Sequence, residues 1–309
     1  MSKLDVLAIG PHPDDVELGC GGTLAMAARQ GRRVGILHLT RGERGTRGTS
    51  EQRLAEAESA AAALGAVELA FLNCGDGALR TGEAEEDALI EVLRTWRPEL
   101  VLGPPARDRH PDHERGHRLV AAAAFYSGLA ARGNRAMAAY RPAAVFSYMQ
   151  HHSFEPSFVV DVTAAWDAKL AALAAYRSQL FQPGAAGGGD APEAGELGAG
   201  ELDAAQPGTG EPDAGGPGGG EDGGGAGATG GSGTRGGGGT GGSVTGTGGS
   251  GTGGGGAATK VASREFRLAI EGRARHFGLM IGAELGEPFY SPVPLAVSDL
   301  LALLPGGLR

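Results

Sequence analysis

Histidine and aspartate side chains crowd into one short turn near the start of the chain. The segment GPHPDDVELGCGG places His12, Asp14 and Asp15 directly after a short apolar run. An imidazole and a carboxylate three residues apart are typical zinc ligands, and a catalytic zinc keeps three protein ligands and one open position. Because neighbouring side chains diverge, one of the two aspartates can bind the metal while the other faces a substrate. The structural alternative is that His12 caps the strand end and the aspartates cap the next helix.

A second histidine-rich segment supplies further ligands. HPDHERGH contains His110, His113 and His117. The proline after His110 disfavours helical geometry at that residue, so we expect His110 just before a helix and His113 in its first turn. His113 can then complete a site with His12 and Asp15. The rival ligand pair is His113 with His117, which share one helix face; we favour His113 alone because His117 is a turn farther from the strand end.

Arginines are concentrated in the same parts of the chain. They are Arg41, Arg44, Arg47, Arg53, Arg107 and Arg109. Guanidinium groups suit bidentate recognition of carboxylate or phosphate, so this set indicates an anionic substrate. The alternative is that they are solvated or contact helices. The glycines of GCGG lack the G-x-G-x-x-G spacing of a dinucleotide loop, so no nucleotide cofactor is expected.

Apolar runs alternate with helical patterns along the chain. Strands are predicted at 4–10, 33–40, 67–73, 99–105, 143–150 and 157–162. Helices are predicted at 22–31, 49–65, 86–98, 111–130, 164–180 and 263–286. Thr49 is the expected N-cap of the second helix, Gly65 its end, and Pro111 the first residue of the fourth. The pattern predicts an α/β fold, a Rossmann-like and mostly parallel sheet with helices on both faces.

The fold class determines where the chemistry should lie. In parallel sheets, sites form at the carboxyl ends of the strands, near the point where strand order reverses. The histidine and arginine motifs follow the first, second and fourth predicted strands. We therefore expect all of them at one edge of the sheet.

Residues 184–258 differ in composition from the rest of the chain. They hold 35 of the 58 glycines, nine acidic residues and one arginine, and so account for nearly all of the net charge of −9. With almost no large apolar side chains, they cannot offset the entropy of ordering. We expect a disordered, glycine-rich insertion, with residues 1–183 and 259–309 forming a single domain.

Bulk composition narrows the function classes. The folded part is nearly neutral, so charge indicates no nucleic acid partner. No apolar run reaches the length of a membrane span, and the N-terminus lacks the layout of a signal peptide, so we expect a cytoplasmic protein. Cys20 and Cys74 provide no disulfide framework and are expected to be buried small hydrophobes.

The paired motifs HPDD and HPDH resemble the PIG-L/LmbE family of zinc-dependent N-acetylglucosamine (GlcNAc) deacetylases. The resemblance covers residues 4–182 and about 262–304. The segments TRGERGTRGTSEQRLAEAE and HFGLMIGAELGEPF further resemble the branch of bacillithiol biosynthesis, which deacetylates N-acetylglucosaminyl-malate.

This resemblance implies roles for individual residues. It implies metal ligation by His12, Asp15 and His113, with one Zn²⁺ per chain. Asp14 is implied to be the general base that takes a proton from the attacking water. His110 is implied to stabilise the oxyanion or to protonate the leaving amine.

The branch resemblance also implies malate binding by arginines, for which Arg53, Arg109 and Arg47 are the candidates. Where some family members place a tyrosine, the nearest residue is Phe266, and no role is assigned to it. Family members are often homo-oligomers, commonly hexamers. Two other interpretations stay open: a metal hydrolase acting on another GlcNAc conjugate, and a non-catalytic sugar-binding protein.

Overall fold

The computed structural model describes residues 3–45, 47–180 and 263–296. They form a seven-stranded sheet of order β3-β2-β1-β4-β5-β7-β6. The first five strands of that order pair in parallel, and β7 is antiparallel to both of its neighbours. The structure thus confirms the predicted α/β class. The expected insertion at 184–258 lies outside the described residues.

The elements have the following bounds. The strands are β1 (Val6–Gly10), β2 (Val34–His38), β3 (Glu68–Phe71), β4 (Leu100–Gly103), β5 (Ala144–Tyr148), β6 (Phe158–Asp161) and β7 (Gly286–Tyr290). The helices are α1 (Asp15–Arg29), α2 (Ser50–Leu64), α3 (Glu83–Trp96), α4 (Pro111–Tyr126), α5 (Trp166–Ala175) and α6 (Arg264–Met280), with a 3₁₀ turn, η1, at Thr163–Ala165.

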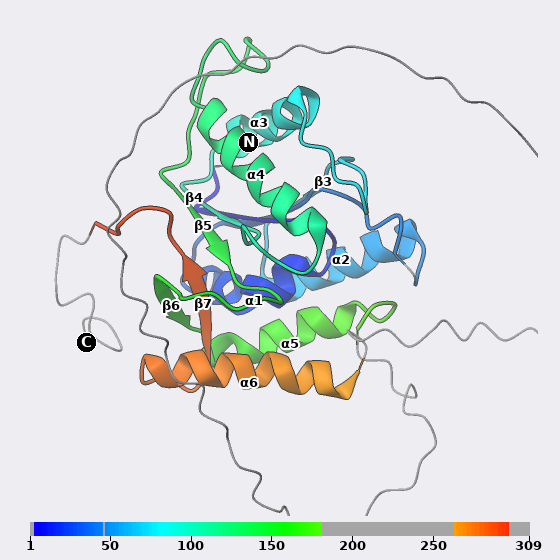
Figure 1. Cartoon of the computed structure of the whole chain (residues 1–309), viewed down its shortest axis with the longest axis vertical. Coiled ribbons are helices and arrows are strands. Elements are labelled where there is room, and N and C mark those ends of the chain that lie inside the picture. Colours follow the sequence, from blue (N-terminus) through cyan, green and yellow to red (C-terminus); the bar gives the residue numbers. More distant parts are fainter. Residues whose placement is uncertain (1–2, 46, 181–262, 297–309) are drawn as a thin grey trace, which may run out of the picture. The chain divides into compact units, whose positions relative to one another are not determined.

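Helices cover both faces of the sheet, with α3 and α4 on one face and α1, α2, α5 and α6 on the other (Figure 1). Side chains of β1 alternate between the two cores, as the period of two in a strand requires. Leu7 and Ile9 pack with the apolar residues of α3 and α4. Ala8 packs with those of α1, α2 and α5 on the opposite face. Burial on both sides explains why the central strands are continuous apolar runs.

Local signals set several helix ends as predicted. The Thr49 side chain accepts the Gln52 N–H at 3.2 Å, and Gly65 ends α2 with a left-handed φ of 75°. Pro111 begins α4, where its missing N–H is not needed. These caps place the loops before α2 and α4, which carry the arginine and histidine motifs, against the carboxyl edge of the sheet.

Strand β7 was not predicted from the sequence. It lies between β5 and β6 and contains Pro288, which argues against a central strand. The structure accommodates the proline because β7 pairs with β5 only through Phe289 and Tyr290. Pro288 therefore lies outside the part of β7 that pairs with β5.

Among the described residues, no helix combines the length and the apolar character needed to cross a membrane.

Candidate active site

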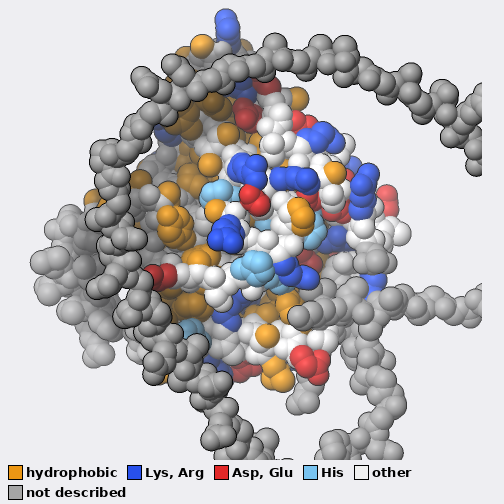
Figure 2. Space-filling view, viewed as in Figure 1, with side chains coloured by type: hydrophobic (Ala, Val, Ile, Leu, Met, Phe, Trp, Pro, Cys, Tyr) orange, Lys and Arg blue, Asp and Glu red, His pale blue; other side chains and the backbone are white. Residues whose placement is uncertain are grey.

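The predicted site residues meet at the carboxyl edge of the sheet, where strand order reverses between β1 and β4. A cleft of about 250 Å³ is lined by His12, Asp14, Asp15, His110 and His113, together with Arg44, Arg53 and Arg109. In the view of Figure 2, histidine side chains lie near the centre of the visible face with basic side chains around them. The two motifs, about 100 residues apart in sequence, thus form one site.

The carboxylate of Asp15 lies between two imidazole rings. Its Oδ2 is 3.1 Å from His12 Nδ1, and its Oδ1 is 3.3 Å from His113 Nε2. All three side chains are buried. The backbone N–H of His12 also donates to Asp15 Oδ2 at 2.9 Å, which fixes the turn between β1 and α1. The structure therefore brings the three predicted metal ligands together.

On the side of the ring away from Asp15, His12 contacts two further carboxylates and His113 contacts one. His12 Nε2 lies 3.3 Å from Asp112 and 3.2 Å from Asp76, and His113 Nδ1 lies 2.7 Å from Asp108. A ring N–H donated to a carboxylate fixes the tautomer and leaves the other nitrogen free as a ligand. This assignment directs His12 Nδ1 and His113 Nε2 toward Asp15.

The donor set fits a divalent cation. Two ring lone pairs facing one carboxylate repel it unless positive charge lies between them. Burial opposes charging His113, but Asp15 and Asp108 outweigh it and raise its pKa to about 9. For His12, hydrogen bonds to Asp112 and Asp15 likewise outweigh burial and raise the pKa well above its usual value. The site therefore favours positive charge. Either protonated histidines or a bound metal ion with neutral histidines can supply it.

The same neighbourhood offers alternative donors. Ligand atoms of His12, His110 and His113 lie within 4.8 Å of one another, as do those of His12, Asp76 and Asp112. The rival residue His117 is not among the residues lining the cleft, and its Nδ1 lies 3.1 Å from the Pro104 carbonyl oxygen. His113 thus lies at the cleft, and His117 is not among its lining residues.

Asp14 has a strained backbone and a perturbed acid group. It precedes α1 with φ 103°, one of two non-glycine residues at positive φ in the described chain. Burial raises the pKa of Asp14 to about 7, although the Arg53 guanidinium, 3.9 Å away, opposes this shift. Strained conformations of this kind persist where the surroundings impose them, and active sites are rich in them. Asp14 therefore presents to the cleft a carboxyl group whose pKa lies near neutrality.

His110 is the N-cap of α4, and its Nδ1 accepts the Asp112 backbone N–H at 3.2 Å. Because Nδ1 accepts a hydrogen bond, the proton of the neutral ring lies on Nε2. Burial and the neighbouring His12 and His113 charges lower the pKa of His110, which favours this neutral form. His110 is therefore a hydrogen-bond donor at the cleft.

The three predicted arginines occupy different surroundings. Arg109 is exposed and lines the cleft. Arg53 also lines it but is 5% exposed, and its guanidinium donates to the Pro13 and Gly42 carbonyl oxygens at 2.7 and 3.1 Å. Arg47 is half-buried and is not among the lining residues. Arg44, not selected as a substrate-binding candidate from the sequence, does line the cleft.

Two supporting residues were missed by sequence reasoning. The buried Gln150, just beyond β5, donates from Nε2 to Asp15 Oδ1. Arg273 of α6 in turn donates to the Gln150 carbonyl oxygen and, at 3.4 Å, to that of Leu18. Neither residue lies in a recognisable motif. Phe266, on the same helix, places its ring 6.0 Å from that of His151.

A break in α1 positions its first turn. Cys20 is non-helical within α1, with φ −144° and ψ 20°. Glu287 of β7 accepts the Gly22 and Thr23 N–H groups at 3.0 and 2.7 Å and caps the second half of the helix. The buried Lys169 donates to Glu287 and to the carbonyl oxygen of Leu18, both within 2.9 Å. These contacts hold the turn that carries Asp15.

The chain is similar to known deacetylases. Residues 7–124 match the family PIG-L, described as GlcNAc-PI de-N-acetylase. The chain is 31% identical over 187 residues to the diacetylchitobiose deacetylase of Thermococcus kodakarensis, covering 57% of this chain and 70% of the relative. It is 32% identical over 163 residues to the 1D-myo-inositol 2-acetamido-2-deoxy-alpha-D-glucopyranoside deacetylase of Rhodococcus opacus, covering 41% of this chain and 56% of that protein.

The described fold has a solved counterpart. The crystal structure of a conserved protein from Thermus thermophilus is 30% identical, with a TM-score of 0.66, over 96% of this chain and 98% of the other. The sequence motifs, the fold and these similarities all indicate the same family. The chain belongs to the PIG-L family of deacetylases, as its sequence predicted.

Proposed function

We propose that the protein removes the N-acetyl group of a GlcNAc conjugate by hydrolysis, releasing acetate and a free amine. The observation that carries this proposal is the buried Asp15 carboxylate between two imidazoles, each backed by a further carboxylate, with Asp14 beside them on the cleft. This arrangement combines a metal site with a general base. A sugar-binding protein without catalysis does not require the strained and half-buried Asp14.

His12, Asp15 and His113 would hold the metal, and we propose zinc. A bound zinc ion supplies Lewis acidity toward the acetamide carbonyl and lowers the pKa of water. The nitrogen and oxygen donors of these side chains suit zinc, and three protein ligands leave a position for substrate or water.

Asp14 takes the proton from the water that attacks the acetamide carbon. A carboxylate with a pKa near 7 is matched to this task at neutral pH. Arg53 donates to two backbone carbonyl groups, which fix its position. Its positive charge opposes the rise in the pKa of Asp14 and so favours the ionised carboxylate.

His110 donates from Nε2 to the oxygen that becomes negative in the tetrahedral transition state. Its Nδ1 is occupied by the Asp112 N–H, which orients the ring. Because its pKa is lowered, the neutral ring acts as a positioned donor. Collapse of the intermediate breaks the C–N bond, and the proton held by Asp14 passes to the leaving amine.

The finer proposal is that the substrate is anionic and is N-acetylglucosaminyl-malate, an intermediate of bacillithiol biosynthesis. Arg44 and Arg109, both exposed at the cleft, support it because guanidinium groups pair with carboxylates. We further propose a cytoplasmic homo-oligomer. Exposed apolar side chains on α6 support self-association, namely Leu268, Leu279 and Met280.

An acetate-release assay on metal-analysed protein tests the proposal. Acetate should form from N-acetylglucosaminyl-malate and more slowly from free GlcNAc, and the Asp14→Asn protein should bind metal without releasing acetate. A protein carrying one equivalent of zinc that releases acetate from no GlcNAc conjugate would contradict the proposed activity. Equal turnover of charged and uncharged conjugates would contradict only the anionic substrate.

A further inference from the structure

A small pocket lies next to the active-site cleft, on the side of helix α6. It has a volume of about 150 Å³. Its apolar walls come from Leu18 of α1 and from three residues of α6, namely Phe266, Ala269 and Ile270. A cavity of about this size with apolar walls can hold a molecule as large as benzene. The pocket therefore has room for several carbon atoms, and the reaction described above does not use this space.

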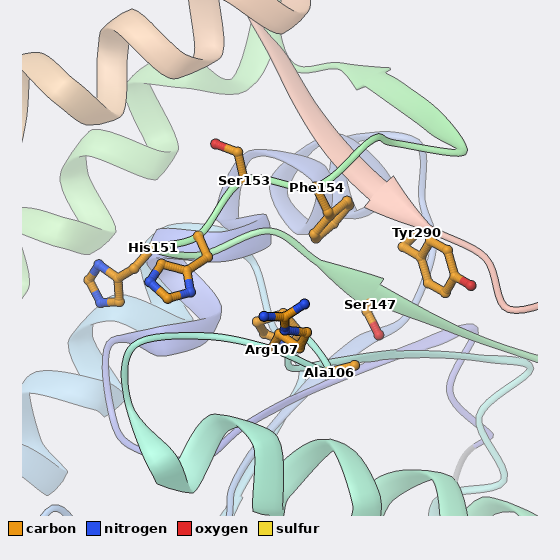
Figure 3. Close-up of a pocket in the computed structure, with 9 residues that line it drawn as sticks. Ala106, Arg107, Ser147, His151, Ser153, Phe154 and Tyr290 are labelled. Carbon is orange, nitrogen blue, oxygen red and sulfur yellow. The ribbon is translucent and has the colours of Figure 1, made fainter. Parts of the chain in front are cut away.

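Two side chains line both the pocket and the cleft, namely Leu18 and His151. A larger cavity of about 680 Å³ also reaches His151, which lies at its opposite end from Tyr290 (Figure 3). Among the described residues that line it, His151 is the only one that the larger cavity shares with the cleft. The small pocket therefore borders the cleft over a longer wall than the large cavity does.

The pocket lies on the side of the cleft formed by Asp15 and His113, two of the proposed metal ligands. Gln150 lines the pocket and donates to Asp15 Oδ1. The His151 ring stacks on that of His113 with centroids 6.0 Å apart and planes at 10°, and it also lies 6.0 Å from the Phe266 ring. One layer of side chains therefore separates the pocket from the proposed metal position.

Two of the cleft arginines lie toward His12 instead. Asp76, whose Oδ1 is 3.2 Å from His12 Nε2, accepts the Arg44 backbone N–H at 2.7 Å. Arg53 donates to the carbonyl oxygen of Pro13, the residue after His12. The guanidinium groups that support an anionic substrate are therefore attached to the His12 side, whereas the apolar pocket adjoins the Asp15 and His113 side.

The shape of an amide matches these two sides. A secondary amide is planar and trans, so the carbon chain on its carbonyl group and the sugar on its nitrogen point away from each other. When the sugar and its anionic group lie toward Arg44 and Arg53, the acyl chain points toward α6. The methyl group of an acetamide would then fill only part of the pocket.

We infer that this pocket receives the acyl chain of the amide, and that the protein also removes N-acyl groups longer than acetyl. By its volume the pocket admits a straight acyl chain of about four carbons. The inference rests on the proposed deacetylation and widens its substrate class to short-chain N-acyl groups. The reaction stays a hydrolysis: water adds to the carbonyl carbon, the C–N bond breaks, and a short carboxylic acid and a free amine are released.

A series of N-acylglucosamines tests the inference, with release of the free amine as the readout. From N-acetyl through N-propionyl to N-butyryl, we expect kcat/KM to rise by about 4-fold per methylene, the gain from burying one such group, and so by roughly 15-fold in all. Ala269→Leu, which adds bulk at the pocket wall, should bring the ratio of N-butyryl to N-acetyl turnover close to one. Ala84→Leu, at an exposed alanine of α3, is the matched control and should keep the wild-type ratio.

A binding measurement separates this inference from the proposed activity. N-acetylglucosamine and N-butyrylglucosamine are titrated calorimetrically into the Asp14→Asn protein and into the same protein carrying Ala269→Leu. We expect the N-butyryl compound to bind about 15-fold more tightly than the N-acetyl compound only where Ala269 is intact. If the wild type releases amine from neither compound, the proposed activity fails, and the ratio of the two Kd values still decides the pocket. A wild-type preference for N-acetyl, or a preference for N-butyryl that Ala269→Leu leaves unchanged, would overturn the inference.

Discussion

The loops after β1, β2 and β4, here called the parallel region, carry the proposed metal ligands, the proposed general base and the cleft arginines. Strands β5 and β7, which pair antiparallel and are here called the mixed region, supply residues that hold these groups in place. In the first region, chemical groups cluster within short motifs such as HPDD and HPDH. In the second, single residues act over long distances, as Gln150 does on Asp15. The parallel region sets which reaction is available, and the mixed region sets how firmly the site is held.

Removing a ligand from the parallel region should have the largest effect. His113→Ala deletes a ring that faces Asp15, so bound metal and acetate release should fall to background. Metal analysis and turnover of the purified protein measure this. His117→Ala is the matched control and should keep both; the reverse result would move the ligand to His117.

Removing the base should separate chemistry from metal binding. Asp14→Asn should lower kcat by roughly 10²–10⁴-fold and keep a full equivalent of metal. Asp14→Gly should lose activity in the same way. It should also raise the free energy of unfolding by about 1 kcal/mol, because glycine adopts positive φ without strain. Near-wild-type turnover of Asp14→Asn would remove this residue from the mechanism.

A variant in the mixed region sharpens the comparison. Gln150→Leu removes the donor to Asp15 but no ligand, so metal affinity should fall by about 10–100-fold while saturating metal restores most of the turnover. Competition with a chelator measures the affinity. Gln179→Leu, which removes a similar amide bonded to the Arg47 carbonyl oxygen, should leave metal affinity unchanged. Equal losses in both variants would make the effect one of general stability.

The arginines should give a smaller effect. Arg109→Ala should raise KM for N-acetylglucosaminyl-malate by about 10-fold, the value of one charged hydrogen bond, and change KM for free GlcNAc little. Arg53→Ala should also lower stability, because that guanidinium is buried against two carbonyl groups. The same KM change for both substrates would assign Arg109 a structural role.

Deleting residues 184–258 should have the smallest effect. Their composition contains few groups that could join a core, and the entropy of closing a loop grows only logarithmically with its length. Melting temperature and acetate release of the deletion variant should stay close to wild type. Loss of activity, or protected amides in this segment during hydrogen exchange, would contradict its assignment as an insertion.

The sequence alone determined the parallel strands and the meeting of the two histidine motifs at their carboxyl ends. Periodicity, the Thr49 cap, Gly65 and Pro111 are local signals, because each acts within one turn of the chain. The histidines and aspartates that line the cleft could be predicted because they lie within two motifs that follow predicted strands, and the carboxyl ends of parallel strands meet at one edge.

Only the tertiary structure decided the rest. Strand β7 is five residues long and contains a proline, so it carried no periodic signal. Glu287 caps α1 across 265 residues, and Gln150 reaches Asp15 across 135, so neither contact leaves a local pattern. Likewise, six arginines looked alike in the sequence, but Arg53 became buried while Arg109 stayed exposed. Burial and partners depend on which elements pack together, and that packing is set by the topology of the whole sheet.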